Sequence, residues 1–254
     1  MGRLDNKVVL ITGSRGMGAA TARMAAAEGA RVFIAALAPE ECELLSAEVG
    51  GGWYAGDLAE EGNAQAAVES CIAQFGRIDG VFNVAGISGR RFGDGPLHEC
   101  SAEGWDTLIN VNLRSLFLVS REVVRYMLAS GHGGSIVNMG SVVALSPEPR
   151  HFATHAYATS KGAIHAFTTA TAAYYAESGI RINAVAPGLV ETPMSLRAQQ
   201  SPEIRIYMQT KQPLAKGLIG ADDVAAAVVF LLSDAARCIT GEIIAIDGGW
   251  RISK

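Results

Sequence analysis

Tyr157 and Lys161 are the residues whose types and spacing point most directly to chemistry. They lie four positions apart in a helix-favouring stretch, so both side chains emerge on one face of the helix. An isolated tyrosine titrates near about 10 and is a poor acid or base at neutral pH. A neighbouring ammonium stabilises the phenolate and lowers the pKa of the phenol. The pair is therefore a candidate acid/base group, although the same spacing also occurs in simple surface pairs.

A glycine-rich segment near the start of the chain is a candidate phosphate-binding loop. Thr12–Gly18 carries three glycines between an apolar run and an Ala-rich stretch. Glycines let the backbone approach a pyrophosphate, and a following helix N-terminus offers free N–H groups and the positive end of a dipole. The Gly-xxx-Gly-x-Gly spacing is also compatible with an ordinary turn. The residues assigned to this loop are Gly13, Ser14, Arg15, Gly16, Met17 and Gly18.

Short apolar runs alternate with longer helical stretches along the chain. The predicted strands are Val8–Ile11, Arg31–Ala35, Trp53–Ala55, Gly80–Val84, Ser135–Met139, Arg181–Val185 and Glu242–Ile246. The predicted helices are Ala19–Glu28, Pro39–Val49, Asn63–Phe75, Trp105–Ser130, Tyr157–Glu177 and Asp222–Leu232. This alternation predicts an α/β fold of the doubly wound Rossmann type, with about seven parallel strands covered by helices on both faces. We expect residues 1–254 to form a single domain, because neither a repeat nor a linker divides them.

Three longer segments interrupt the alternation of strands and helices. They are Ser88–Ser101, Ser146–His155 and Pro187–Ile219. Each follows the carboxyl end of a predicted strand, where open α/β sheets bind ligands. Because long loops in compact domains are often functional lids, we expect these segments to form the rim around a substrate.

Composition and charge exclude several classes of protein. The 254 residues are 49% hydrophobic and 18% charged, with a mean hydropathy of +0.22, which excludes a disordered chain. A net charge of −4 argues against a nucleic-acid partner, because phosphate backbones need a basic surface. No uncharged apolar stretch reaches the ~18–20 residues of a membrane span.

Cysteine usage and the start of the chain indicate a cytoplasmic protein. The four cysteines form no CxxC pair, so we expect reduced, mostly buried thiols and no metal site or disulfide. Met1–Lys7 carries charges and leads directly into a strand-like run, unlike a signal peptide. The cysteines are Cys42, Cys71, Cys100 and Cys238.

Taken together and in order, the motifs resemble those of the short-chain dehydrogenase/reductase family. The resemblance covers nearly the whole chain and rests on Thr12–Gly18, Asn83–Gly86, Asn112, Ser141, Tyr157–Lys161, Pro187–Gly188 and Asp247–Gly249. It implies an NAD(P)-dependent oxidoreductase that interconverts a secondary alcohol and a ketone by hydride transfer. Two alternatives stay open at this point: a 3-ketoacyl-carrier-protein reductase and a non-catalytic dinucleotide-binding sensor. An intact catalytic set argues against the sensor, and the lack of an obvious Lys/Arg cluster argues against docking of an acidic carrier.

The resemblance also implies a role for each catalytic residue. Tyr157 is expected to exchange a proton with the substrate oxygen, and Lys161 to hold the ribose next to the nicotinamide. Ser141, at the end of a strand, would hydrogen-bond the carbonyl and polarise it. Ser146 is a nearby competitor, because the interval from Ser141 to Tyr157 is longer than the family usually has. The excess is expected in an extended loop at Pro147–His155.

Asn112 matches the helix asparagine that is thought to support a water-linked proton relay in the family. Asn110 lies only two positions away, and residues i and i+2 do not share a helix face. Only one of the two can point inward, and the Asn-Leu context favours Asn112. A purely structural asparagine at a helix bend is the other interpretation.

Further positions are similar to the family's cofactor-binding residues. Asp57, with Leu58 beside it, resembles the adenine-binding aspartate. The segment around the adenine ribose is present, although Val84 replaces its second asparagine. The remaining positions that the resemblance implies are Asn83, Ala85, Gly86, Pro187, Gly188, Val190 and Thr192, the last four near the nicotinamide carboxamide.

The choice between the two nicotinamide cofactors depends on the end of the second predicted strand. A carboxylate there pairs with the ribose hydroxyls of NAD and repels the 2′-phosphate of NADP. Ala36 and Leu37 occupy the place and carry no charge. Arg15 lies where many NADP-using relatives have a basic residue, although it is also compatible with a solvated loop arginine. We therefore expect NADP(H), with NAD(H) as the alternative.

Other charged residues give weaker signals. His151 and His155 lie four apart in a rim segment, but no third ligand is evident and the family needs no metal. Arg90 and Arg91, beside Asp94, could neutralise an acidic group of a substrate, although such pairs are usually solvated.

Two predicted helices carry apolar or small residues on more than one face. A helix of this kind usually buries a second face, here against another copy of the chain. The family is commonly tetrameric, so we expect a homotetramer, with a dimer as the alternative, and a small-molecule carbonyl or alcohol as the other partner. The residues concerned are Leu116, Phe117, Val119, Phe167, Ala170, Ala173 and Tyr174.

Overall fold

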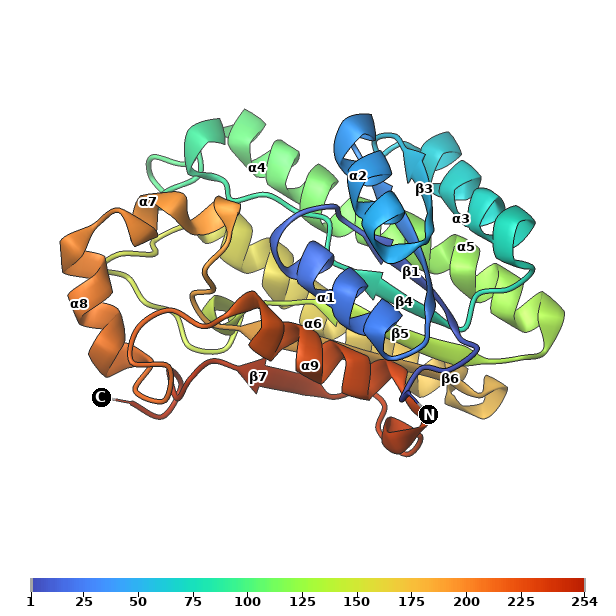
Figure 1. The fold of residues 1–254 in the computed structure, drawn as a ribbon. Helices are drawn as coiled ribbons and strands as arrows, with labels where there is room; N and C mark the ends of the chain where they lie inside the picture. Colours follow the sequence, from blue (N-terminus) through green and yellow to red (C-terminus); the bar gives the residue numbers. More distant parts are fainter. Residues whose placement is uncertain (1, 254) are drawn as a thin grey trace.

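A computed structural model describes residues 2–253, and its seven strands form one parallel sheet (Figure 1). The strand order is β3-β2-β1-β4-β5-β6-β7. The chain therefore winds outward from the β1–β4 neighbours in both directions, which confirms the predicted Rossmann-type fold. The strands are β1 Val8–Thr12, β2 Arg31–Ala36, β3 Gly52–Ala55, β4 Gly80–Asn83, β5 Gly134–Met139, β6 Ile180–Pro187 and β7 Ile243–Ile246.

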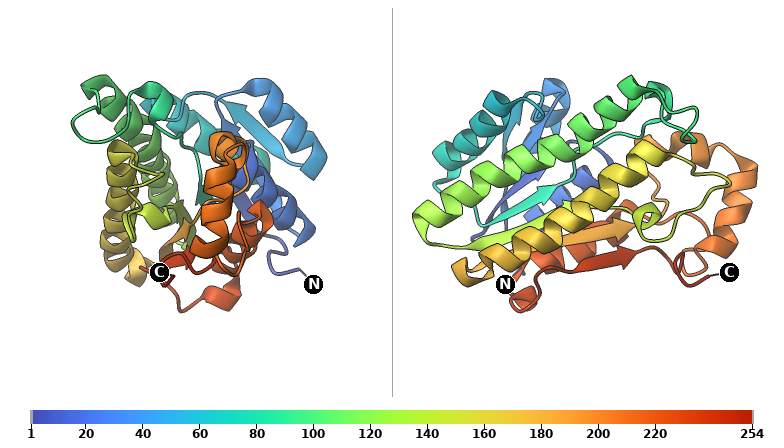
Figure 2. Two further views of the ribbon diagram at one scale, coloured as in Figure 1. Left: turned by 90° about the vertical axis from the view of Figure 1, so that its left-hand side faces the viewer. Right: turned by 180° about the vertical axis from the view of Figure 1, so that it is seen from behind.

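Helices cover both faces of the sheet. Residues of α1, α2 and α9 pack in one buried cluster, and residues of α3, α5 and α6 pack in the other. Figure 1 shows α1 and α9 in front of the sheet, and the right-hand view of Figure 2 shows α5 and α6 side by side behind it. The helices are α1 Gly16–Ala27, α2 Pro39–Val49, α3 Glu61–Phe75, α4 Ala102–Leu108, α5 Ser115–Ser130, α6 His155–Tyr175, α7 Leu196–Gln199, α8 Pro202–Lys211 and α9 Ala221–Leu232.

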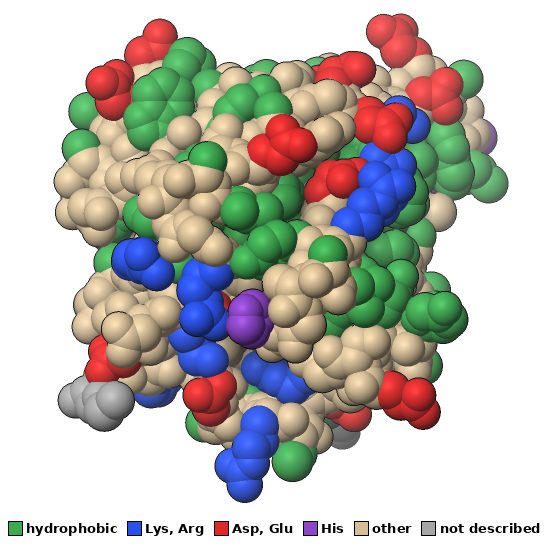
Figure 3. All heavy atoms as spheres, turned by 90° about the vertical axis from the view of Figure 1, so that its right-hand side faces the viewer, with side chains coloured by type: hydrophobic (Ala, Val, Ile, Leu, Met, Phe, Trp, Pro, Cys, Tyr) green, Lys and Arg blue, Asp and Glu red, His purple; other side chains and the backbone are tan. Residues whose placement is uncertain are grey.

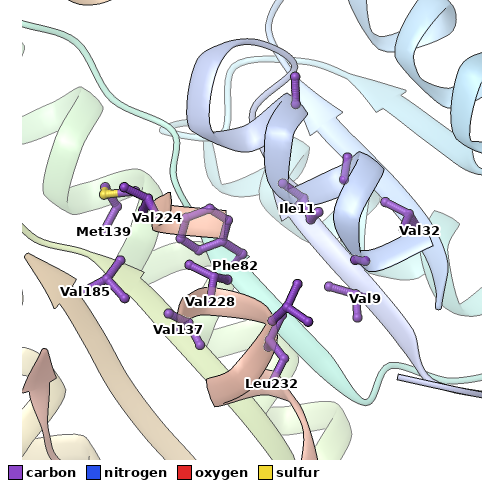
Figure 4. Close-up of a cluster of buried hydrophobic side chains, with 14 of the residues drawn as sticks. Val9, Ile11, Val32, Phe82, Val137, Met139, Val185, Val224, Val228 and Leu232 are labelled. Carbon is purple, nitrogen blue, oxygen red and sulfur yellow. The ribbon is translucent and has the colours of Figure 1, made fainter. Parts of the chain in front are cut away.

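The inner strands β1, β4, β5 and β6 are buried on both faces, which is why they read as continuous apolar runs in the sequence. Alternate residues of β1 face opposite clusters: Val9 and Ile11 lie in the cluster with α9, while Val8 and Leu10 lie in the other. Figure 4 shows the α9 side, where Val224, Val228 and Leu232 of the helix lie beside side chains of the sheet such as Phe82 and Val137. Close packing of this kind fixes the carboxyl ends of the strands, from which the site is built.

The structure differs from the sequence prediction around the fourth predicted helix. Helical structure begins at Ala102, before the predicted start at Trp105, and a π-helical segment at Ile109–Arg114 separates α4 from α5. Residue periodicity in the sequence does not resolve such a segment, because six residues are too few to show a change of period. π-Helical turns are often found at functional sites.

The segment Pro187–Ile219 is not a plain loop as its composition indicated. It contains α7 and α8, which stand at the end of the molecule where the strands terminate (Figure 2, left). α8 begins at Pro202, with the hydroxyl of Ser201 accepting a hydrogen bond from the N–H of Ile204. Its apolar residues pack with Trp250 in a third, smaller cluster.

Two further observations bear on the composition arguments. All four cysteines are free; Cys42 and Cys71 are buried, but Cys100 is half-buried and Cys238 exposed, so the expectation of mostly buried thiols is only half right. Between residues 2 and 253, no helix is long and apolar enough to cross a bilayer.

Candidate active site

A cavity of about 360 Å³ opens at the carboxyl ends of β4, β5 and β6. All three segments that interrupt the sequence pattern contribute to its wall, the first through Ser88–Arg91 and the second through Phe152 and Thr154. The third contributes residues of the chain between β6 and α7. Tyr157, Lys161 and Ser141 line the same cavity. The segments predicted as a rim and the residues predicted as catalytic therefore lie at one place.

The side chains of Ser141 and Tyr157 lie next to each other in the cavity wall, close enough for Ser141 to lower the pKa of the phenol. Ser141 directly follows the end of β5 and Gly140, while Tyr157 lies in the first turn of α6, so two separate elements deliver the hydroxyls to one point. Ser146, the competing serine, does not line the cavity; its carbonyl oxygen accepts a hydrogen bond from the indole N–H of Trp250 at 3.0 Å. The geometry thus places Ser141, and not Ser146, beside the phenol.

The pKa of Tyr157 is shifted in the direction opposite to the sequence-based expectation. Burial raises the pKa of Tyr157, and the neighbouring hydroxyl of Ser141 opposes that rise. The ammonium of Lys161 lies 5.6 Å from the centre of the phenol ring, beside its face. Removal of the hydroxyl from water therefore dominates, because a buried phenolate loses its hydration. The phenol is held protonated at neutral pH.

Lys161 is a buried cation. Its Nζ donates a hydrogen bond of 2.8 Å to the carbonyl oxygen of Met139, the last residue of β5. Burial lowers the pKa of Lys161 from 10.5 to about 8. The ammonium has three donors, so two are left for a ligand in the cavity once Met139 has taken one.

Asn112 is fully buried in the π-helical segment, whereas Asn110 is exposed, as their spacing predicted. The Asn112 amide pairs with the backbone of Ile87, accepting from its N–H at 2.8 Å and donating to its carbonyl at 3.2 Å. It also donates to the hydroxyl of Ser160 at 3.3 Å. The side chain therefore joins the chain after β4 to α6 behind the catalytic face.

Asp94 anchors the helix that carries the candidate catalytic pair, a role that sequence reasoning missed. It is buried, and its two carboxylate oxygens accept the backbone N–H groups of Ala156 and Tyr157 at 2.9 and 3.0 Å. A carboxylate here satisfies N–H groups at the start of α6 and complements the helix dipole. No local spacing signals this contact, because Asp94 lies about 60 residues before the helix.

The glycine-rich loop fits a pyrophosphate. α1 begins at Gly16 within the loop, and neither a capping side chain nor an acidic residue occupies its first turn. Gly16 has a φ of +50°, and a Cβ at Gly18 would lie 2.5 Å from the carbonyl oxygen of Gly13. The backbone is thus close-packed around a helix N-terminus at which the N–H groups of Gly16 and Met17 have no acceptor within residues 2–253 and can bind an anion, while that of Gly18 donates to the carbonyl of Arg15.

A carboxylate lies near the adenosine end, although not at the position considered in the sequence. Leu37, after β2, is exposed and uncharged, but Glu41 in the first turn of α2 reaches the loop. Its carboxylate forms an ion pair with Arg15 and accepts a hydrogen bond from the hydroxyl of Ser14 at 2.9 Å. Asp57 is exposed, and its carboxylate accepts the N–H of Ala59 at 2.9 Å.

The side chain of Asn83 lies inside the protein. Its amide nitrogen donates to Ser120 and to Asn138 at 2.9 Å each, which ties β4 to β5 and α5. Any contact of Asn83 with a cofactor would therefore be made through its backbone. Next to it, the buried hydroxyl of Thr12 accepts the N–H groups of Val84 and Ala85, which positions the turn after β4.

The chain after β6 is held in place by a buried glutamine. Gln212 accepts the N–H of Leu189 at 2.6 Å and donates to the carbonyl of the same residue at 3.2 Å. The predicted nicotinamide-side residues of this turn are brought to the cavity wall: Pro187, Gly188, Val190 and Thr192. Met17, Val84, Gly86, Tyr157 and Lys161 also line it; the remaining cofactor positions that the resemblance implied lie outside the cavity.

The apolar wall of the cavity was not foreseen. Trp250 is buried after β7, and its ring lies 5.5 Å from that of Phe152, centre to centre. Val142, Leu189 and Ala198 complete this wall. These residues come from four separate segments, so only the fold brings them together.

The two rim histidines do not form a shared site with other ligating residues. The ring of His151 packs against Tyr207 and Phe152, and the backbone N–H of His155 donates to the carbonyl of Gly95. Within residues 2–253, no group of three or more His, Cys, Asp or Glu side chains is placed to hold a metal ion.

Comparison with known proteins places these features in context. Residues 11–251 match a family model described as Enoyl-(Acyl carrier protein) reductase. The chain is 37% identical to D-threitol dehydrogenase of Mycolicibacterium smegmatis, covering 98% of this chain and 95% of the relative. It is 34% identical to cis-4-hydroxycyclohexanecarboxylate dehydrogenase of Sinomonas cyclohexanicum, with 96% of each chain covered. It is 38% identical to a 3-oxoacyl-acyl-carrier-protein reductase of Thermotoga maritima, with 97% and 98% covered.

Solved structures show the same similarity in fold. Levodione reductase superposes with a TM-score of 0.90 at 33% identity, covering 99% of this chain and 100% of that one. The structure titled gox2181 superposes with a TM-score of 0.92 at 31% identity, with 98% and 96% covered. The similarity therefore extends over nearly the full length in sequence and in fold.

Proposed function

Because the chain belongs to the short-chain dehydrogenase/reductase family, we propose that it interconverts a secondary alcohol and a ketone with Tyr157 as the general acid/base. Membership of the family makes it an oxidoreductase of CH–OH groups that uses a nicotinamide dinucleotide. The observation that carries the proposal is that Ser141 and Tyr157 lie next to each other beside the buried ammonium of Lys161, in one cavity with the turn after β6.

The side chains divide the work on the substrate oxygen. When bound, the nicotinamide supplies or accepts the hydride. Tyr157 donates its proton to the carbonyl oxygen during reduction, and its raised pKa keeps that proton available at neutral pH. Ser141 donates to the same oxygen as negative charge develops there. In the oxidation of an alcohol the phenol must first lose its proton, so the two directions differ in pH dependence.

Lys161 and Asn112 support the pair. The buried Lys161 ammonium, held at the end of β5 by Met139, has donors left for the hydroxyls of the nicotinamide ribose. Its positive charge also stabilises the phenolate that remains after proton transfer. Asn112 fixes the backbone of Ile87 and contacts Ser160, next to this lysine on α6, and is the proposed support of a proton relay.

We propose NADP(H) as the preferred cofactor. Arg15 lies in the phosphate-binding loop with a largely exposed guanidinium, and neither Ala36 nor Leu37 carries a charge that would repel a 2′-phosphate. Glu41 favours the alternative, because its carboxylate neutralises Arg15 and would repel the phosphate. NAD(H) is therefore the second candidate. Substitution of Arg15 and of Glu41 distinguishes between the two cofactors.

We also propose that the protein self-associates through α5 and α6, as a homotetramer or, failing that, a dimer in the cytoplasm. Of the apolar residues noted in the sequence, Leu116 and Val119 face the core, whereas Phe117 and Tyr174 are exposed. Phe117 and Phe167 line a hollow between the two helices. A second copy of the chain would cover this face.

A substrate panel tests the proposed reaction. Simple ketones, oxo acids, sugars and a carrier-bound 3-ketoacyl thioester are offered with NADPH or NADH. Oxidation of the cofactor is followed by the loss of its absorbance. We expect turnover of at least one small ketone, with the secondary alcohol product identified by mass spectrometry. Turnover restricted to the carrier-bound thioester would support the ketoacyl reductase, the activity named for the relative from Thermotoga maritima. Tight dinucleotide binding without any turnover would indicate a sensor.

A further inference from the structure

The charged residues that line the cavity are all basic. Within the described chain they are Arg90, Arg91, Lys161 and Arg197, and no aspartate or glutamate is among the lining residues. At the opposite end of the molecule, by contrast, acidic and basic side chains are interspersed (Figure 3). In a chain whose net charge is −4, a cavity lined only by positive charges is a local feature and does not reflect the composition.

Two of these arginines converge from different loops. Arg90 follows β4 and Arg197 lies in α7, yet both guanidinium groups donate to the carbonyl oxygen of His151, at 2.9 and 3.2 Å. Neither forms an ion pair with any carboxylate of residues 2–253, whereas the nearby Arg150 pairs with Glu203 at 3.0 Å. Arg90 and Arg197 are thus held close together with only a neutral acceptor between them.

Two adjacent guanidinium groups without a counter-ion repel each other. Partial burial and the positive charge of Arg90 both lower the pKa of Arg197. A guanidinium has five N–H donors, and each of these two uses one on His151. The free donors and the uncompensated charge are suited to a carboxylate, which accepts two parallel hydrogen bonds from an arginine.

Most of the remaining wall is apolar. Phe152, Val142, Leu189 and Trp250 line the same cavity as the arginines and the Ser141–Tyr157 pair, and they pack against one another. A ligand that fits this lining has a hydrocarbon body, an oxygen at the tyrosine and an anionic group at the arginines. On the premise that the protein reduces a ketone, we propose that its substrate carries a carboxylate, which Arg90 and Arg197 bind at the mouth of the cavity.

The test compares acids with matched neutral ketones. Three oxo acids of increasing length (4-oxopentanoate, 5-oxohexanoate and 6-oxoheptanoate) and their primary amides are assayed with saturating reduced cofactor at neutral pH. We expect at least one acid to exceed its amide in kcat/KM by about 10-fold or more, the range of a charge-assisted hydrogen bond. In R197Q and in R90Q, the KM of that acid should rise about 10-fold, with the KM of the amide and of the cofactor within about 2-fold of wild type.

Arg150→Gln is the matched control, because it removes one positive charge from the same rim without touching the cavity. It should leave the acid's KM unchanged.

Equal kcat/KM for acids and amides in the wild type, with turnover of both, would overturn the carboxylate proposal and leave the proposed ketone reduction unaffected. A rise in the KM for the cofactor in R197Q would assign the arginines to the dinucleotide instead. If kcat/KM falls equally for acid and amide in R197Q and R90Q, the arginines serve only to hold the loop at His151, and the carboxylate proposal is wrong. Failure to reduce any ketone would instead contradict the proposed function itself.

Discussion

At the scale of single residues, the site depends on a half-buried tyrosine and a buried lysine whose proton affinities are shifted by loss of hydration. Burial raises the pKa of the Tyr157 phenol and lowers that of the Lys161 ammonium, so both shifts favour the uncharged form. The sequence-based view of the pair included only the attraction between phenolate and ammonium. Depth of burial was missing from it, because only the fold determines how much water reaches the pair.

The lysine shift predicts a pH dependence of stability. The pKa of Lys161 is about 8 in the folded protein, against 10.5 for a fully hydrated lysine, so the unfolded chain holds more protons between these values. Stability therefore rises with pH across this window, by about 3 kcal/mol from this group. In K161M that contribution disappears. We expect the free energies of unfolding of wild type and K161M, measured by denaturant from pH 7 to 11, to diverge across the window; parallel curves would contradict the buried charge.

Cofactor preference depends on Arg15 and Glu41. Replacement by R15Q should raise the KM for NADPH about 10-fold and leave that for NADH unchanged, because only NADPH offers a 2′-phosphate to the guanidinium. E41Q should lower the KM for NADPH, because it frees Arg15 from its ion pair. Steady-state kinetics with both reduced cofactors measures the two effects. A wild type that uses NADH better, with neither variant altering the ratio, would refute the assignment of NADP(H).

At the scale of elements, the position of α6 is central, because it carries both Tyr157 and Lys161. Asp94 binds its first N–H groups from the segment after β4, and Asn112 contacts it from the π-helical segment. The sequence predicted this helix to within two residues at its start, since Tyr-xxx-Lys lies in a clear helical pattern. It did not predict either contact, because both join residues that are distant along the chain.

Loss of the Asp94 carboxylate should affect stability and catalysis together. We expect D94A to lower the free energy of unfolding by about 1–3 kcal/mol and to reduce kcat, because the first turn of α6 loses its acceptors and Tyr157 moves. Ser101→Ala is the control: Ser101 caps α4 by accepting the N–H of Gly104 at 3.0 Å. That variant should lose about 1 kcal/mol and retain its kcat. Equal kcat in D94A and S101A would argue against a positioning role for Asp94.

Other elements show why part of the architecture escaped prediction. All seven strands were found from short apolar runs, and the signal is unbroken in the inner strands because helices bury both of their faces. α8, by contrast, carries polar residues on most of its surface and buries only Ile204 and Met208. Its pattern therefore read as part of a long loop. The apolar cavity wall escaped for another reason, since Phe152 and Trp250 meet only through tertiary packing.

At the scale of the whole molecule, the face of α5 and α6 (Figure 2, right) determines assembly. We expect the wild type to run as a tetramer in light scattering, and F117E together with F167E to shift it to a smaller species, because charges would be buried in the interface. Leu44→Glu serves as control, because Leu44 is an exposed residue of α2, and this variant should keep the molecular mass of the wild-type assembly. A monomeric wild type at micromolar concentration would exclude self-association.

The most direct test of the central claim, that Tyr157 transfers the proton, is the turnover of Y157F with whichever ketone proves best in the substrate panel. The variant keeps the ring and removes only the hydroxyl, so the cavity and the contact with Lys161 stay in place. Proton transfer by a positioned side chain contributes about 10²–10⁴-fold. We therefore predict a fall in kcat of that size, with the dissociation constant of the reduced cofactor, from fluorescence titration, unchanged within about 2-fold. A Y157F enzyme with wild-type kcat would contradict the claim.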